Sequence, residues 1–174
     1  MKGAVLAAVT AGVIAVAGLV ALGESVQVAP VPAGDQLGAE AGESWEAYAQ
    51  RAAESLAQAP AEEPVFALVT FLPGAGPAEA AAELEGIGRV NAAVFAGKAA
   101  QPVPEPTGGD GRAEVFTRAA ERAGVDPGSL LGVVIYAPGG QLREVAGRAG
   151  VAAVEALPPD AVWGAFAIVP TPAS

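Results

Sequence analysis

The chain has 174 residues and contains neither histidine nor cysteine. These two absences exclude histidine-based catalytic triads, cysteine nucleophiles, thiolate metal sites, haem ligation by either residue, and disulfide bonds. Catalysis would have to come from Ser, Thr, Tyr, Lys, Arg or carboxylates, and no serine stands in a recognisable pattern with a base. We therefore expect no enzyme activity, and we assign no catalytic, cofactor-binding or metal-binding residue.

Positive charge is scarce as well. The chain carries 9 basic and 19 acidic residues, which gives a net charge of −10. A protein of this charge repels the phosphate backbone, so we expect no nucleic-acid partner. The same imbalance argues against attraction of a basic patch to an anionic membrane surface.

Charge is missing altogether from residues 3–22. As a helix, these 20 residues reach about 30 Å, the thickness of the hydrocarbon core of a bilayer. This run predicts a transmembrane anchor over residues 1–23 that contacts the lipid bilayer through residues 3–22. Lys2 is the only cation beside it, which favours a cytoplasmic amino terminus and an extracytoplasmic carboxy-terminal domain. A cleaved signal peptide, which would give a secreted protein, and a soluble helix remain as alternatives.

Residues 24–63 carry eight acidic residues against one basic residue, Arg51. Several prolines and glycines interrupt residues 27–42, which predicts an extended linker. Residues 44–59 predict an amphipathic helix, because Ser44 suits the N-cap position and Pro60 ends the pattern. We interpret residues 24–63 as an acidic stalk that contains this helix.

One face of the predicted helix 44–59 gathers its large apolar side chains, Trp45, Tyr48 and Leu56. A helix of this length is marginal alone in water, so this face needs a surface to cover it. The surface that we favour is the domain that follows, through a sheet face left open by helices on one side only. The alternative is that Trp45, Tyr48 and Leu56 form a contact face for an unknown protein partner.

Residues 64–169 read as a globular domain built from two similar halves. Strands are predicted at residues 65–72 and 89–96 around a helix that begins near Ala78, and again at 131–136 and 151–157 around a helix at 141–148. A further helix, 112–123, lies between the halves. Two successive strand–helix–strand units predict an α+β fold of the ferredoxin-like plait type, with an extra helix between the halves. A doubly wound parallel sheet is the alternative.

The last residues are predicted to contain one more strand and a frayed end. Alternating apolar residues predict a strand over 162–169 after Pro158-Pro159. Residues 170–174 read as a free tail. Gly74 and Gly76 follow a strand and precede a helix, but Glu79 stands where a dinucleotide-binding loop has its third glycine, so we interpret this segment as a turn.

Two resemblances follow from these patterns. The run Leu131-Gly-Val-Val-Ile-Tyr, the helix Gln-Leu-Arg-Glu-Val-Ala and the run Gly150-Val-Ala-Ala-Val-Glu-Ala-Leu resemble the second half of the subtilisin propeptide, or peptidase inhibitor I9, domain. This resemblance implies a ferredoxin-like fold and, as an alternative function, protease inhibition. The whole layout, with one apolar segment, a helix carrying Trp45 and the globular part, resembles uncharacterised membrane-anchored proteins of high-GC actinobacteria, which implies location rather than a reaction.

We therefore expect a single-pass membrane protein whose extracytoplasmic domain acts as a binding or sensory module. The alternatives are a protease inhibitor of the I9 type and a small hydrolase that uses Ser or carboxylates.

Overall fold

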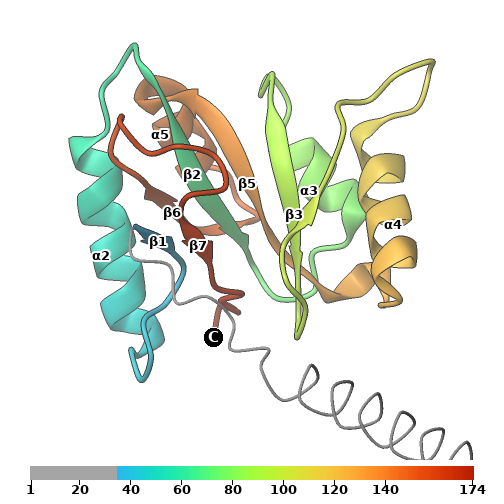
Figure 1. Cartoon of the computed structure of the whole chain (residues 1–174), viewed down its shortest axis with the longest axis horizontal. Helices are drawn as coiled ribbons and strands as arrows, with labels where there is room; N and C mark the ends of the chain where they lie inside the picture. Colours follow the sequence, from blue (N-terminus) through green and yellow to red (C-terminus); the bar gives the residue numbers. More distant parts are fainter. Residues whose placement is uncertain (1–34) are drawn as a thin grey trace, which may run out of the picture. The chain divides into compact units, whose positions relative to one another are not determined.

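The computed structural model describes residues 35–174, which belong to one compact unit (Figure 1). The predicted anchor over residues 1–23, with its bilayer contact through 3–22, and the first part of the predicted stalk lie outside the described residues. Within residues 35–174, no helix has the length and apolar character needed to cross a membrane.

A five-stranded sheet forms the centre of the described unit, in the order β4-β3-β5-β2-β6. Its strands are β2 (Pro64–Phe71), β3 (Val90–Phe95), β4 (Gln101–Pro102), β5 (Leu130–Pro138) and β6 (Val151–Ala156). Every neighbouring pair in this sheet is antiparallel, which rules out the doubly wound parallel alternative. The α+β class is confirmed, and the two predicted strand–helix–strand units are present.

Helices α3 (Pro77–Glu83), α4 (Arg112–Ala123) and α5 (Gly139–Ala146) cover one face of the sheet. Alternate residues of β2, Val65, Val69 and Phe71, are buried in one hydrophobic core together with apolar residues of these helices. The other alternate residues of β2, Phe66 and Leu68, belong to a second core on the opposite face.

A thin layer covers that opposite face. Its regular part is a two-stranded parallel ribbon of β1 (Gln36–Leu37) and β7 (Ala167–Ile168). Figure 1 shows this ribbon and the red carboxy-terminal segment in front of the sheet, with α5 behind it. Leu37 is fully buried in the second core. The prediction of an extended linker is therefore wrong for this stretch, because Leu37 packs against this face of the sheet and pairs with Ile168 of β7.

Helix α2 (Trp45–Gln58) matches the predicted helix 44–59, with the Ser44 hydroxyl accepting from the Ala47 amide as expected of an N-cap. It runs beside the edge strand β6 (Figure 1). The Ser55 hydroxyl accepts a hydrogen bond of 3.0 Å from the Ala156 amide, so the helix satisfies part of the edge that a strand would otherwise pair. The helix thus covers an edge, while the thin layer covers the open face that we expected it to take.

The predicted strand over 162–169 is mostly wrong. Only Ala167–Ile168 forms a strand, because Gly164 adopts φ +85° and turns the chain before it reaches the ribbon. The end of the chain is not a free tail either. Thr171 is buried, and its hydroxyl accepts a hydrogen bond of 2.7 Å from the Ala39 amide.

Candidate functional site

Three large apolar side chains are exposed together on the face of the sheet that the thin layer covers. They are Tyr136 on β5, which is 41% exposed, and Val162 and Trp163 in the segment after β6, which are 65% and 40% exposed. Beneath them lie Phe66 and Phe166, both buried. We call these five residues the aromatic patch; four of them are among the chain's nine aromatic residues.

Phe66 holds the aromatic patch together. Its ring centre lies 4.7 Å from that of Tyr136, 5.6 Å from that of Trp163 and 5.3 Å from that of Phe166. Trp163 and Phe166 meet nearly edge to face at 5.8 Å. These separations are those of favourable aromatic pairs, so the buried rings fix the positions of the exposed ones.

The backbone explains how residues distant in sequence meet here. Tyr136 stands opposite Phe66 in the register of β5 and β2. After β6, the Leu157 amide donates to the Phe66 carbonyl at 2.8 Å, which places the following segment beside Phe66. A turn closed by the Ala161 amide and the Pro158 carbonyl then leads to Val162 and brings Trp163 to the ring of Phe66.

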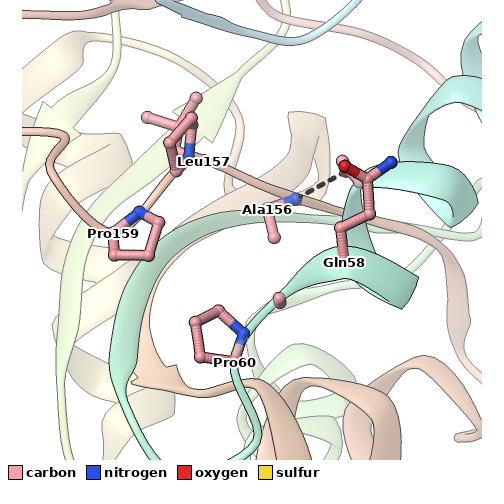
Figure 2. Close-up of a pocket in the computed structure, with 8 residues that line it drawn as sticks. Gln58, Pro60, Ala156, Leu157 and Pro159 are labelled. Atoms are coloured by element: carbon pink, nitrogen blue, oxygen red, sulfur yellow. Dashed lines mark hydrogen bonds between the residues drawn. The ribbon is translucent and has the colours of Figure 1, made fainter.

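A small cavity of about 280 Å³ lies between the end of α2 and the segment after β6 (Figure 2). Its walls include Gln58, Pro60, Leu157 and Pro159, so they are largely apolar. Leu157 also belongs to the second core together with Phe66. The cavity and the aromatic patch are therefore joined through residues 157–163.

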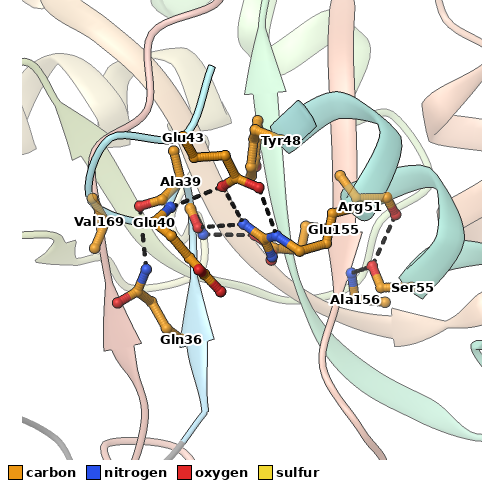
Figure 3. A network of polar contacts seen from close by, with 12 residues as sticks. Gln36, Ala39, Glu40, Glu43, Tyr48, Arg51, Ser55, Glu155, Ala156 and Val169 are labelled. Carbon is orange, nitrogen blue, oxygen red and sulfur yellow. Dashed lines mark hydrogen bonds and ion pairs between the residues drawn. The ribbon is translucent and has the colours of Figure 1, made fainter. Parts of the chain in front are cut away.

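A group of polar side chains surrounds Arg51 on α2 (Figure 3). Arg51 binds Glu43 with two hydrogen bonds, from Nε to Oε1 at 3.0 Å and from Nη2 to Oε2 at 2.8 Å. Its Nη1 pairs with Oε1 of the buried Glu155 on β6, and its Nη2 donates to the Gly38 carbonyl at 3.0 Å. The Gly38 amide in turn donates to Oε2 of Glu155 at 2.6 Å.

The pKa values in this network shift for different reasons. Hydrogen bonds from Arg51 lower the pKa of Glu43 to about 2, and the same bonds raise the pKa of Arg51. Burial raises the pKa of Glu155, against the hydrogen bond from Gly38 and the charge of Arg51. Burial also raises the pKa of the Tyr48 hydroxyl.

Every bond of the Arg51 network joins parts of the fold to one another. Glu43 and Gly38 precede α2, Arg51 lies on α2, and Glu155 lies on β6. A buried ion pair whose remaining oxygens and protons are also hydrogen-bonded holds its elements in one arrangement. We therefore interpret the Arg51 network as structural: it fastens the segment before α2 to the sheet.

Most of the predicted contact face is buried against other parts of the same chain. Tyr48 is fully buried, and its hydroxyl lies 3.4 Å from that of Thr70 on β2. Leu56 is buried in the main core. Trp45 is half-buried and stacks on Tyr48 with ring centres 5.5 Å apart. Tyr48 and Leu56 thus cover the domain, as the favoured interpretation expected, and they offer no surface to a partner.

Two further carboxylates, those of Glu105 and Glu83, also stabilise the fold. Glu105 pairs with Arg112 at 3.1 Å and accepts from the Val90 amide at 2.7 Å. Glu83 accepts from the Gly150 amide at 2.9 Å. Within residues 35–174, no group of acidic side chains is arranged to hold a metal ion.

Sequence reasoning missed the aromatic patch because it placed Trp163 on a regular strand. A signal was nevertheless present: Pro158-Pro159 and Gly164 bracket Val162 and Trp163, which is typical of a loop. No comparable local signal identifies Tyr136, because its exposure depends on where the covering layer ends.

No protein-family model, curated protein or solved structure matches the chain.

Proposed function

We propose that this protein is a membrane-anchored binding or sensory module whose extracytoplasmic domain contacts its ligand through the aromatic patch. The observation that carries the proposal is the exposure of Tyr136, Val162 and Trp163, with the rings of Tyr136 and Trp163 packed on that of Phe66. Tyr and Trp are the residues most enriched at binding surfaces, because they bury much area and lose little conformational entropy. The uncharged residues 3–22 supply the proposed anchor.

For the domain we propose a ferredoxin-like plait with an extra helix, α4, between its halves. The support is the order β3-β5-β2-β6 with antiparallel neighbours, combined with the connections β2-α3-β3 and β5-α5-β6. These are the connections of a split pair of strand–helix–strand units.

A binding role suits the chemistry of the described residues better than a catalytic one. The most deeply buried carboxylate, that of Glu155, is held by Arg51 and Gly38 within the fold. The aromatic patch and the cavity beside it present apolar surface rather than a nucleophile with a base. A hydrolase that uses Ser or carboxylates therefore draws no support from this surface.

The inhibitor alternative draws little support from the chain after β6. In the I9 resemblance, an extended tail would run on from the last strand into a protease. Here the chain turns at Pro158, crosses back over the sheet and pairs β7 with β1. A tail held in this way would have to detach before it could enter a cleft.

Topology can be tested sharply, because the chain has no cysteine of its own. Ser174→Cys places a single thiol at an exposed position, and Gly3→Cys places one at the other end of the proposed anchor while keeping Lys2. In intact cells, a membrane-impermeant maleimide should label the Ser174→Cys protein and leave the Gly3→Cys protein unlabelled until lysis. Labelling of the Ser174→Cys protein only after lysis would overturn the proposed orientation, and recovery of a shortened protein from the medium would establish a cleaved signal.

The role of the aromatic patch can be tested by replacing Trp163 with a photo-crosslinking amino acid in the full-length protein in its own cells. Leu72 provides a matched control, because it is 46% exposed but lies at the other end of β2 from Phe66. We expect a defined adduct from position 163 and none from position 72. Equal adducts at both positions, or none at either, would contradict a binding role for the aromatic patch.

A further inference from the structure

We propose that the aromatic patch binds a proline-rich peptide segment in the polyproline II conformation that carries a basic residue beside its prolines. This inference rests on the proposed function and names the chemical class of its ligand. It follows from three properties of the surface: the spacing of its rings, the polar groups that the rings carry, and the charge at its border.

The exposed rings lie close enough together for one polyproline II helix to contact both. Tyr136 and Trp163 contact the same Phe66 ring at 4.7 and 5.6 Å, so their own centres are at most about 10 Å apart. A polyproline II helix rises 3.1 Å per residue and repeats every three residues, or about 9.3 Å. About one repeat of a proline-rich segment is therefore long enough to contact Tyr136 and Trp163 at the same time.

The rings also carry the polar groups that such a ligand needs. A polyproline II helix has no internal hydrogen bonds, so its carbonyl groups require donors when they leave water. The Tyr136 hydroxyl and the Trp163 indole N–H are donors located at the edges of exposed rings. Peptide-binding domains that recognise proline-rich segments combine an aromatic surface and such donors in the same way.

The cavity beside the aromatic patch extends this surface along the chain. Pro158 and Pro159 line the cavity, and the turn that they begin leads directly to Val162 and Trp163. A volume of about 280 Å³ is enough for one apolar side chain of a ligand that lies across the rings. The ligand is thus expected to run from Trp163 towards Pro60 on the far wall of the cavity.

Acidic residues around the aromatic patch favour a basic residue on the ligand. Three exposed acidic residues lie at this end of the sheet: Glu62 and Glu63 just before β2, and Asp160 just after β6. Arg89, whose carbonyl accepts the Tyr136 amide, is paired with Glu105 at 3.6 Å. The border of the aromatic patch therefore favours a ligand with an Arg or Lys, and a net charge of −10 attracts such a ligand from a distance.

The proposal can be tested with the full-length protein in a non-ionic detergent and fluorescein-labelled decapeptides, by fluorescence anisotropy. The main probe has eight prolines followed by two arginines. A second decapeptide keeps the two arginines but replaces the prolines with alternating glycine and serine, and a third follows the eight prolines with two glutamates. Cellohexaose, an unlabelled neutral glycan, tests whether the rings bind sugars instead.

We expect the proline–arginine peptide to bind most tightly, and both control peptides to bind at least tenfold more weakly. Trp163→Ala and Tyr136→Ala should each weaken binding of the main probe at least tenfold, whereas Leu72→Ala should change it less than twofold. Thermal melting of each variant checks that it has folded. If Trp163→Ala does not fold, Trp163 emission in a Trp45→Phe background should still change when the main probe is added.

Equal binding of the proline and glycine–serine peptides, or binding that Trp163→Ala leaves unchanged, would overturn the proposal. A change in Trp163 emission in the Trp45→Phe background on addition of cellohexaose, without binding of any peptide, would replace it with glycan binding. If no probe binds but position 163 still gives a photo-crosslink in cells, the ligand class is wrong and the binding role survives. If both experiments fail, the proposed function falls as well.

Discussion

Leu37→Ala offers the most direct test of how residues 35–43 relate to the domain. Leu37 is fully buried in the core on the open face of the sheet, together with Leu68 and Phe166. Its strand, β1, has only two residues, and a stalk that merely carried the domain would tolerate the change. The structure predicts a large loss of stability instead.

The expected loss can be estimated from how firmly Leu37 is held. The Val169 amide donates to the Leu37 carbonyl at 2.8 Å, and the next residue, Gly38, bonds both Glu155 and Arg51. Because these bonds keep the backbone in place, the substitution leaves a cavity that the chain cannot close. Leu→Ala changes of this kind cost about 2–5 kcal/mol, which is a large part of the roughly 5–15 kcal/mol that stabilises a typical domain.

The assay is urea unfolding followed by tryptophan fluorescence. With an m value of about 2 kcal/mol per molar, the expected loss lowers the unfolding midpoint by roughly 1–2.5 M. Leu72→Ala removes the same atoms from a position that is 46% exposed, so it should cost no more than about 1 kcal/mol. If Leu37→Ala shifts the midpoint no further than Leu72→Ala does, the segment before α2 is a separable stalk and the reasoning fails.

Two further predictions concern the sheet and the Arg51 network. Gly132→Ala should destabilise the protein by several kcal/mol or prevent folding, because a Cβ at this position would lie 2.3 Å from the Val69 carbonyl oxygen; Gly147→Ala, whose Cβ would lie no closer than 3.5 Å to a neighbour, should leave the melting temperature almost unchanged. Glu43→Gln should flatten the acid side of the stability profile. Arg51 lowers the pKa of Glu43 from 4.5 to about 2, so the unfolded chain binds this proton first and stability falls as the pH drops from about 4.5 to 2. Urea midpoints measured at pH 5 and pH 3 should therefore differ less in Glu43→Gln than in the native protein, and an unchanged difference would contradict the role given to Arg51.

Local sequence signals were sufficient for the elements of the main core. Helix α2 begins after Ser44 and ends before Pro60, and β2 is a continuous apolar run between Pro64 and Pro73, so propensity, capping and burial agree. Strands that are buried on both faces leave a strong apolar pattern, which is why β2 and β5 were predicted. The parts that were predicted well are those in which the pattern and the packing require the same residues.

The covering layer could not be predicted in the same way. β1 and β7 have two residues each, and a strand of that length has no detectable period. Leu37 lies between glycines and acidic residues in a stretch whose composition is that of a linker. Its burial depends on pairing with Ile168, more than 100 residues later, and a contact of that separation leaves no local signal.

The position of the aromatic patch follows from this asymmetry between the two faces of the sheet. Three helices pack on one face, whereas within residues 35–174 the other face is covered by a short ribbon and a turning segment. This layer buries Phe66 and Phe166, but it leaves the neighbouring rings of Tyr136 and Trp163 partly exposed. Tyr136 and Trp163 stand at that boundary, with one side of each ring against Phe66 and the other in water. For the ligand that we propose, rings already positioned by Phe66 would lower the entropic cost of binding, and the stiffness of a polyproline II segment would lower it further.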